Sequence, residues 1–402
     1  MINTIELFAG VGGFRIGLER EGGFQVVWGN QWEPTRKKQD AFDCYSRNFS
    51  GNGIHSNQDI ATVDAKQFID KDIQLIVGGF PCQDYSVARS LSNEKGIEGK
   101  KGVLFWEIVR FIHDIKPKYV LLENVDRLLK SPSKQRGRDF SIMLASLRDE
   151  GYNVEWRVIN AADYGFPQRR RRVFIFASLR NSPYYRKYKN KTFEEMIHQH
   201  GFFSPKFPIQ SETSNKNKPQ QFLLPKDIVS ISDNFLAKYY NAGIMINGVV
   251  YSKEILPVKK EPKTLGNILE KNVDEKYYLT EEKLEKFKYL KGAKRIPRTS
   301  KSGHTYVYSE GAVAFPDPLD KPGRTMLTSE GSVNRSTHVI EDPQTKRLRI
   351  LTPVECERLN GFPDGWTEGM SDRMRYFTMG NALVVGLIEK MASRIKEIEY
   401  EN

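Results

Sequence analysis

Cysteine is scarce in this chain: Cys44, Cys82 and Cys356 are the three among 402 residues. They lie far apart, are odd in number and form no C-x-x-C pair of the kind that zinc ribbons use. This scarcity argues against a disulfide framework and favours a reducing cytoplasm. Because Cys44 and Cys356 each lie in a helical pattern of apolar residues, we expect both to be small buried side chains.

Long hydrophobic runs are also lacking, so no membrane-spanning helix is expected. The first residues lead directly into a strand-like segment, and we expect no signal peptide. Acidic residues are outnumbered, with 50 Asp and Glu against 62 Lys and Arg, which gives a formal net charge of +12. Together with a pI near 9.3, this balance indicates a polyanionic partner such as nucleic acid. A basic enzyme without such a partner would show the same composition.

Apolar runs alternate with helical patterns through the first half of the chain. Strands are expected at 5–8, 24–28, 75–77, 119–122, 154–159 and 173–177, and helices at 12–21, 104–115 and 140–150. Such alternation is typical of parallel strands in a doubly wound α/β sheet. Residues 180–348 have weak periodicity and many Lys, Asn, Ser and Tyr residues, and we expect short mixed β structure with loops there.

Regular structure is expected again from Arg349 onward. Thr352 is placed to cap a helix whose first residue is Pro353. A second helix is expected to follow Gly380-Asn381 and to run to the C-terminus. Its apolar face would consist of Leu383, Leu387, Ile388 and Met391.

Cys82 stands in a setting that favours chemistry over packing. It follows an apolar strand and the run Gly78-Gly79-Phe80-Pro81. In open α/β sheets, ligands bind beyond the carboxyl ends of the strands, and the glycines allow a sharp turn there. Cys82 is therefore a candidate nucleophile. The segment 83–101, with its glycines and charges, is predicted to close over a bound substrate.

The ends of the first strands carry candidate ligand-binding residues. The turn Gly10 to Gly13 lets a ligand approach a helix N-terminus, but Arg15 replaces the third glycine of the dinucleotide fingerprint. Gln31, Trp32 and Glu33 follow the second strand, where nucleotide-binding folds place a group for ribose hydroxyls. Asp59-Ile60 is a similar candidate after a possible third strand. A structural turn and a surface tryptophan would explain these features equally well.

Glu123 and an arginine run mark two further strands. A carboxylate at the end of a buried strand is costly unless it is paired or functional, and function is favoured for Glu123. In the run from Arg169 to Arg172, alternation puts Arg170 and Arg172 on one face and Arg169 and Arg171 on the other. One pair would face a pocket, although a basic solvent face is the commoner explanation of such a run.

The stretch from Lys291 to Tyr308 interleaves basic and aromatic residues. This composition suits a surface that touches phosphates and bases. A solvated basic loop is an equally good interpretation of the same residues.

Taken together, the motifs closely resemble, in order and spacing, those of the C5-cytosine DNA methyltransferases over almost the whole chain. The matching segments are Phe8 to Gly13, Gly79 to Gln83, Glu123-Asn124-Val125, Gln168-x-Arg170-x-Arg172, Arg349 to Pro363 and Gly380-Asn381. The resemblance implies a Rossmann-like α/β fold with a doubly wound, mostly parallel sheet that binds S-adenosylmethionine and no metal. It also implies a catalytic domain of residues 1–180 plus 372–402 and a smaller, mixed target-recognition domain of residues 181–371.

The resemblance also implies roles for individual residues. Cys82, Glu123, Arg170 and Arg172 would be catalytic, and the cofactor would contact Phe8, Gly10, Gly12, Gly13, Gln31, Trp32, Asp59, Ile60, Pro81, Leu104, Asn381 and Leu383. Gln31 stands where relatives carry the ribose-binding carboxylate, with Glu33 two residues later, so either is a candidate for the ribose. Ala382 replaces a common serine after Asn381, which matters little if the contact is through backbone.

The implied reaction moves a methyl group to C5 of a flipped-out cytosine in a short duplex DNA sequence. Cys82 would add to C6 of the ring, Glu123 would hold N3 and the exocyclic amine, and Arg172 would hold O2. The enzymes most similar in organisation are prokaryotic and cytoplasmic, and we expect a monomer. The enzyme would protect host DNA from a restriction endonuclease that recognises the same DNA sequence, without direct contact between the two proteins.

Three other functions fit less well. A tRNA cytosine methyltransferase would have a compact variable region with a Cys-Phe-Thr signature, whereas this region is long and contains no cysteine before Cys356. A catalytically silent DNA-binding protein would not need Cys82, Glu123 and Arg172 together. A nicotinamide oxidoreductase is disfavoured because Arg15 breaks the fingerprint.

Overall fold

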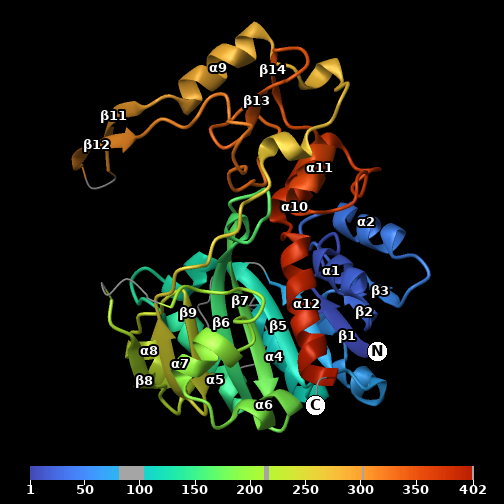
Figure 1. Cartoon of the computed structure of the whole chain (residues 1–402), viewed down its shortest axis with the longest axis vertical. Helices are drawn as coiled ribbons and strands as arrows, with labels where there is room; N and C mark the ends of the chain where they lie inside the picture. The colour runs from blue at the N-terminus through green and yellow to red at the C-terminus, as the bar shows by residue number, and fades with distance from the viewer. Residues whose placement is uncertain (81–103, 212–216, 301–302, 401–402) are drawn as a thin grey trace. The chain divides into compact units, whose positions relative to one another are not determined.

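The structure is a computed structural model that describes residues 1–80, 104–211, 217–300 and 303–400. The chain divides into two compact units. Unit 1 comprises Met1–Tyr164, Arg171–Lys260 and Val385–Asn402, and unit 2 comprises Gly165–Arg170 and Glu261–Val384. Figure 1 shows both units in one colour gradient along the chain.

Unit 1 is built on one sheet, in which ten strands of the described chain take the order β3-β2-β1-β4-β5-β7-β6-β9-β10-β8. The strands are β1 (Ile2–Leu7), β2 (Phe24–Asn30), β3 (Ile54–Ser56), β4 (Leu75–Gly79), β5 (Tyr119–Val125), β6 (Tyr152–Asn160), β7 (Arg171–Leu179), β8 (Gln220–Leu223), β9 (Ala242–Ile246) and β10 (Val249–Lys253). All six strands expected from the sequence form, and the α/β fold class is confirmed.

The sheet has a parallel half and an antiparallel half. β3, β2, β1, β4 and β5 run parallel, whereas β5 pairs antiparallel with β7, and β7 with β6. Of the six expected strands, only β7 therefore departs from the expected parallel direction, because it runs opposite to both of its neighbours and β6 again has the direction of β5. The connection between β6 and β7 contains one short helical turn, Ala161–Asp163, which is too little for the crossover that parallel strands need.

Residues after the predicted domain boundary continue the same sheet. β9 pairs with β6, from Val154 opposite Met245 to Arg157 opposite Ala242, and β10 and β8 extend the edge. The compact units therefore have other bounds than the predicted domains, since residues 181–260 belong to unit 1. The expectation of short mixed β structure is met here by a three-stranded extension of the main sheet. Which unit recognises the target stays a prediction.

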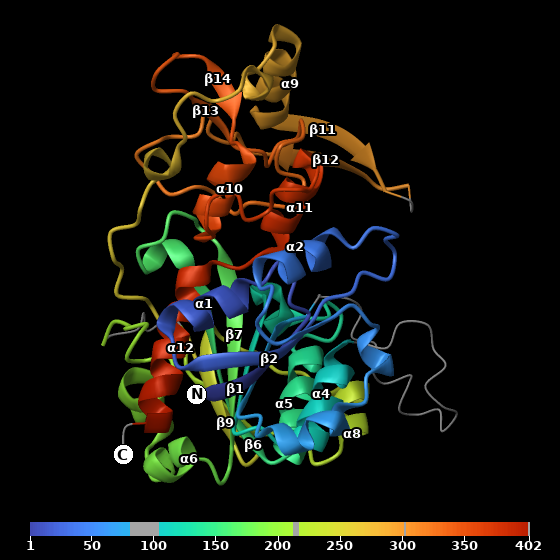
Figure 2. The ribbon, with the colours of Figure 1, turned by 90° about the vertical axis from the view of Figure 1, so that its right-hand side faces the viewer.

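Helices cover both faces of the sheet in unit 1, with α1 and α12 on one side and α4 and α5 on the other (Figure 2). The helices of this unit are α1 (Gly13–Glu21), α2 (Asp40–Asn48), α4 (Leu104–Ile115), α5 (Arg138–Asp149), α6 (Pro183–Tyr188), α7 (Phe193–Glu195), α8 (Ile228–Asn234) and α12 (Val385–Tyr400). Cys44 is buried in α2, as expected. At Gly17 a Cβ would lie 2.6 Å from Ile388 Cβ, so a glycine lets α1 and α12 approach closely.

The C-terminal helix begins later than expected. α11 (Asp372–Asn381) ends at the Gly380-Asn381 motif, and Ala382 is extended, which separates α11 from α12. Leu387, Ile388 and Met391 are buried on α12, but Leu383 lies in the connection before it. The predicted apolar face is thus correct for the three residues that the helix contains.

Unit 2 contains short strands and helices. These are α9 (Glu281–Lys291), β11 (Lys294–Thr299), β12 (Thr305–Glu310), β13 (Val339–Glu341), β14 (Leu348–Ile350), α10 (Pro353–Asn360) and α11. Thr352 caps α10 and forms a reciprocal capping box with Glu355, so the predicted helix start is confirmed. Cys356 is fully buried in α10, also as predicted.

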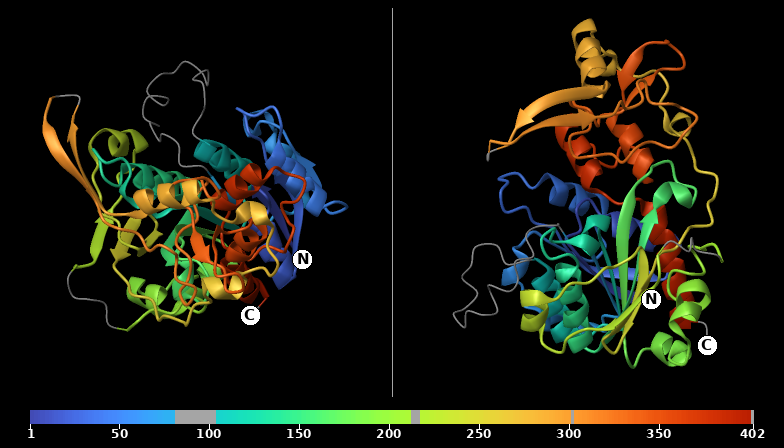
Figure 3. Two further views of the ribbon diagram at one scale, coloured as in Figure 1. Left: turned by 90° about the horizontal axis from the view of Figure 1, so that it is seen from above. Right: turned by 90° about the vertical axis from the view of Figure 1, so that its left-hand side faces the viewer.

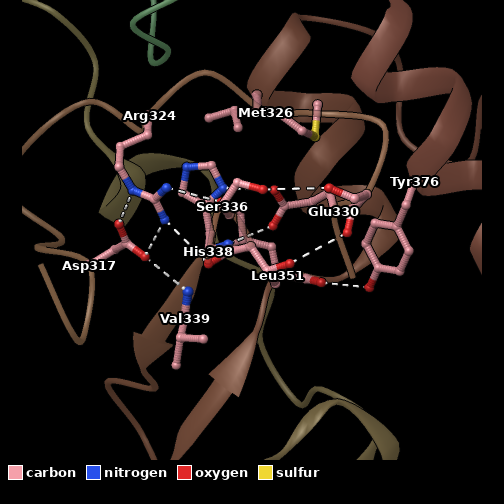
Figure 4. A network of polar contacts seen from close by, with 12 residues as sticks. Asp317, Arg324, Met326, Glu330, Ser336, His338, Val339, Leu351 and Tyr376 are labelled. Atoms are coloured by element: carbon pink, nitrogen blue, oxygen red, sulfur yellow. Dashed lines mark hydrogen bonds and ion pairs between the residues drawn. The ribbon is translucent and has the colours of Figure 1, made fainter. Parts of the chain in front are cut away.

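Buried ion pairs hold the β13–β14 region of unit 2. The Arg349 guanidinium donates to Glu355 Oε1 at 2.7 Å and to Asp342 Oδ2 at 2.8 Å, and all three side chains are buried. Figure 4 shows a second network, in which Arg324 pairs with Asp317 and His338 Nδ1 lies 3.1 Å from Glu330 Oε2. Buried charges persist only when paired in this way. In the described part of the chain, no helix combines the length and apolar character needed to cross a membrane.

Candidate active site at the carboxyl ends of the parallel strands

The strand order reverses between β1 and β4, because the chain leads from β1 outward to β2 and β3, and later from β4 outward to β5. Ligands of open α/β sheets bind at such a switch point, beyond the carboxyl ends of the strands. Pairing places Leu7 beside Gly78, and Gly79 beside Glu123. The glycine turn after β1, the segment entering Cys82 and the Glu123 carboxyl are therefore neighbours.

The glycine turn has a backbone that its sequence requires. Phe8, Gly10 and Gly12 have positive φ angles of 55°, 57° and 91°. Gly12 precedes α1, and a Cβ there would lie 2.4 Å from Phe49 Cε2, so only glycine fits. The Gly10 amide donates to Gln31 Oε1 at 2.8 Å, which ties the turn to the end of β2.

A buried polar cluster underlies the turn, and sequence analysis missed it. Glu6 on β1 accepts hydrogen bonds from the Tyr45 hydroxyl at 2.9 Å and from the Arg15 amide at 3.3 Å. Burial raises the pKa of Glu6 to about 7. The Arg15 side chain, also buried, donates to Glu19 Oε1 at 2.7 Å and lies over the Phe49 ring. A carboxylate within a buried strand was the signal that could have revealed this cluster.

The segment after β2 contains a carboxylate, that of Glu33, with one oxygen still available to accept a hydrogen bond. Glu33 Oε1 lies 3.4 Å from Arg36 Nε, whereas its Oε2 is buried and lacks a hydrogen-bond partner among the described residues. Burial raises the pKa of Glu33, against the opposing effect of Arg36. Trp32 is 37% exposed, so its ring is accessible for stacking. A buried acceptor without a donor is unusual in folded proteins, and it favours a ligand hydroxyl at this position.

Glu123 at the end of β5 pairs with an arginine of β7. The distance from Arg172 Nε to Glu123 Oε1 is 2.8 Å, and the two side chains are 17% and 12% exposed. A Cβ on Gly79 would lie 3.2 Å from Glu123 Oε2, so the glycine leaves room for that oxygen. Glu123 and Arg172 are thus brought together at one strand end, in a place that solvent reaches only partly.

Asn124 fixes the start of the segment that carries the nucleophile candidate. Its side-chain amide donates to the Phe80 carbonyl at 3.0 Å, and its oxygen accepts the Val125 amide at 2.8 Å. The Glu-Asn-Val motif therefore anchors the backbone directly before Pro81. Pro81, Cys82 and the segment 83–101 themselves lie outside the described residues.

The four arginines alternate as predicted, with Arg169 and Arg171 exposed and the other two shielded. Arg170, however, is engaged within unit 2, where its guanidinium donates to the Met326 carbonyl at 3.0 Å and the Gly380 carbonyl at 2.9 Å. Arg170 thus supports the packing of unit 2, and Arg172 is the arginine that meets Glu123. A catalytic role for Arg170 stays a prediction.

The remaining cofactor candidates have simpler surroundings. Asp59 accepts the Ala61 amide at 3.0 Å and caps the short turn Ile60–Thr62, in which Ile60 is buried. Leu104 is the first residue of α4. Asn381 and Leu383 belong to unit 2, where Asn381 is exposed. Within the described ranges, no group of His, Cys, Asp and Glu side chains has an arrangement that could hold a metal ion.

Comparison with known proteins identifies the family of the chain. Residues 2–397 match the family described as C-5 cytosine-specific DNA methylase. The Type II methyltransferase M.Sau3AI of Staphylococcus aureus is 56% identical over 99% of this chain and 96% of its own length. M.HhaI of Haemophilus parahaemolyticus, also a Type II methyltransferase, is 26% identical over 98% of this chain and 94% of its own.

Solved structures with this fold include two eukaryotic proteins. A DNMT2 variant of Spodoptera frugiperda superposes with a TM-score of 0.61 at 14% identity over 100% of both chains. The Dnmt2 methyltransferase of S. pombe has a TM-score of 0.59 at 17% identity, covering 99% of each chain. At this identity the likeness concerns the fold alone.

Proposed function

Because this chain belongs to the C-5 cytosine-specific DNA methylase family, we propose that it methylates C5 of a cytosine through a covalent bond between Cys82 and C6 of that base. The observation that carries this proposal is the Glu123–Arg172 pair at the end of β5, beside the backbone that leads to Cys82. The pair supplies a carboxyl group and a guanidinium to the polar edge of a base.

The proposed chemistry begins with the thiolate. Cytosine C5 is a weak nucleophile until the Cys82 sulfur adds to C6 and makes the ring enamine-like. Protonated Glu123 would donate its proton to N3 as sulfur adds to C6, and its other oxygen would accept from the exocyclic amine, while Arg172 would donate to O2. C5 then takes the methyl group, which leaves S-adenosylhomocysteine as the demethylated cofactor. A base, which solvent can supply, removes the C5 proton, the bond between sulfur and C6 breaks, and N3 returns its proton to Glu123. The products are 5-methylcytosine, S-adenosylhomocysteine, a proton and the free Cys82 thiolate.

The described residues fit S-adenosylmethionine, which supplies an electrophilic methyl group when bound. At Gly10 nothing lies within 4 Å of the position that a Cβ would take, and the N-cap of α1 has no side-chain hydrogen bond, so a ligand can approach the backbone of the glycine turn. The Gln31 side-chain oxygen is already used by the Gly10 amide, whereas the buried Glu33 Oε2 is an acceptor without a donor. We therefore assign the ribose hydroxyls to Glu33 and the adenine face to Trp32, with Gln31 holding the turn.

Duplex DNA is the proposed substrate. A thiol cannot reach C6 inside a base stack, so the cytosine must be flipped out, at a cost of a few kcal/mol. The net charge of +12 suits phosphate binding that weakens as salt rises. Since the relatives include Type II methyltransferases, we also propose that this enzyme protects host DNA beside a restriction endonuclease.

The test is bisulfite sequencing of plasmid DNA from cells that express the chain or its Cys82→Ser variant. The proposal predicts full protection of cytosines within one short motif and no protection with the variant. Cofactor binding by both proteins is the control for folding. If folded, cofactor-binding protein protects no cytosine in DNA, the DNA assignment is wrong, and cellular tRNA becomes the substrate to examine.

A further inference from the structure

Unit 2 contains a two-stranded antiparallel ribbon, formed by β11 and β12. Its register runs from Lys294 opposite Glu310 to Thr299 opposite Thr305. The ribbon extends from the end of α9 as a hairpin, which both views of Figure 3 show. The two strands carry three basic residues, all on β11, against one acidic residue.

One face of the ribbon is occupied by its own contacts. Residues that pair directly across two strands share a face, so this face carries Lys294, Ile296, Arg298 and their partners. The Arg298 guanidinium lies over the Tyr308 ring at 4.0 Å. Lys294 Nζ donates to the Leu290 carbonyl at 3.2 Å and lies 4.5 Å from the centre of the Tyr289 ring. The two cations on this face are therefore engaged within unit 2.

The opposite face is open along its whole length. Its six residues are Arg295, Pro297, Thr299, Thr305, Val307 and Ser309, and all are exposed. Among the described residues, the Arg295 guanidinium has no hydrogen-bond or ion-pair partner. Val307 is 62% exposed although it is a β-branched apolar residue in a strand. We call this set the open face.

The base of the ribbon is held firmly. Arg335 donates to the carbonyls of Leu290 at 2.8 Å, Gly292 at 3.2 Å and Gly311, and its Nε lies 3.0 Å from Glu310 Oε1. A single guanidinium thus binds the chain on both sides of the hairpin. The Val313 amide adds a bond to the Lys291 carbonyl at 2.9 Å. Such anchoring fixes the direction of the ribbon, as a recognition element requires.

We propose that the open face of the β11–β12 ribbon reads base edges in the major groove of the DNA target, and this rests on the proposed function. The major groove admits a two-stranded β-ribbon. The open face offers three kinds of contact that suit the groove: the Arg295 fork for guanine O6 and N7, hydroxyls of Thr299, Thr305 and Ser309, and the Val307 side chain for a thymine methyl group. Its basic charge is complementary to the phosphates on either side.

The two faces provide a matched comparison on one hairpin. Arg295→Ala removes the free guanidinium of the open face, and Arg298→Ala removes the stacked guanidinium of the other. Arg295→Lys keeps the charge but loses the bidentate fork. For each protein, methylation rates are measured on duplexes that contain the wild-type motif and on duplexes with every single base-pair change in that motif.

The expected result is that Arg295→Ala and Arg295→Lys lose discrimination tenfold or more at one position of the motif, whereas Arg298→Ala keeps wild-type discrimination. Thermal melting of each variant controls for folding. The inference is overturned if both alanine variants weaken all duplexes equally, with a salt dependence reduced by about one ion, because that pattern marks a phosphate contact. Unchanged discrimination in Arg295→Ala also overturns it. If the wild-type protein methylates no duplex, the proposed function has failed instead.

Discussion

Arg172 Nε lies 2.8 Å from Glu123 Oε1, across the antiparallel pair β7 and β5. The pair stands where the parallel half of the sheet meets the antiparallel half, because β5 is parallel to β4 and antiparallel to β7. Glu123 thus comes from the last strand of the parallel half and Arg172 from the first strand of the antiparallel half. The two side chains meet at the carboxyl end of β5. A base held here would meet a carboxylate and a guanidinium whose orientations are already fixed.

Replacing Arg172 by alanine is expected to lower kcat by about 100- to 1000-fold, the range for removal of one preorganised donor to a developing charge. Arg171→Ala is the matched control, since Arg171 is the next residue, exposed, and paired with Asp126. Single-turnover methylation of one duplex measures the effect. Equal activity of the two variants would show that Arg172 does not contact the reacting base.

Glu33→Gln is expected to weaken binding of S-adenosylmethionine by about tenfold or more, because a hydrogen bond to a charged acceptor is worth about 1.5–3 kcal/mol. Gln31→Glu is expected to leave the glycine turn intact, since the new carboxylate can still accept the hydrogen bond from the Gly10 amide. Calorimetric titration with the cofactor gives both affinities. Unchanged affinity in Glu33→Gln, together with tighter binding in Gln31→Glu, would move the ribose contact to residue 31.

Gly12→Ala is expected to lose cofactor affinity and stability. The new Cβ would lie 2.4 Å from Phe49 Cε2 in a backbone with φ of 91°. Gly51→Ala is the control, because Gly51 has φ of 87° but nothing within 4 Å of its Cβ position. Positive φ costs an alanine about 1 kcal/mol, and only Gly12→Ala adds a clash to that cost. Equal melting temperatures would contradict a tightly packed turn.

Glu6 predicts a specific dependence of stability on pH. Its pKa is raised from 4.5 to about 7 in the folded protein, so the folded state binds this proton more tightly than the unfolded chain. Stability is then lost as pH rises from about 4.5 to about 7, by about 3 kcal/mol at most. Glu6→Gln should remove this loss, which melting curves at pH 5 and pH 8 would measure. If the difference in melting temperature between the wild-type protein and Glu6→Gln is the same at both pH values, Glu6 does not cause the pH dependence.

Sequence reasoning succeeded where local pattern determines structure. The six apolar runs gave strands within a few residues, and Thr352 and Pro353 located a helix start through capping. The antiparallel course of β6 and β7 could not be predicted in this way, because an apolar run has the same period in either direction. The join of β9 to β6 likewise depends on pairing between residues that are far apart in the chain.

The individual residues of the candidate active site could be predicted from the sequence, but the contacts between them could not. Glu123 and Arg172 were expected from their motifs, but only the register of β5 and β7 shows that they meet. The same sequence alternation grouped Arg170 with Arg172, yet Arg170 is bound by backbone carbonyls of unit 2. The Glu6–Tyr45 contact joins residues from β1 and α2 and has no local signature.

The central claim is the covalent bond between Cys82 and cytosine C6. A duplex with 5-fluorocytosine at the methylated position tests it, because fluorine cannot leave C5 as a proton does and the sulfur–carbon bond then persists. With S-adenosylmethionine present, the account predicts a protein–DNA complex that survives denaturing electrophoresis, and no such complex with Cys82→Ser. A wild-type enzyme that methylates ordinary DNA yet forms no stable complex, or a complex that forms equally well with Cys82→Ser, would contradict the account.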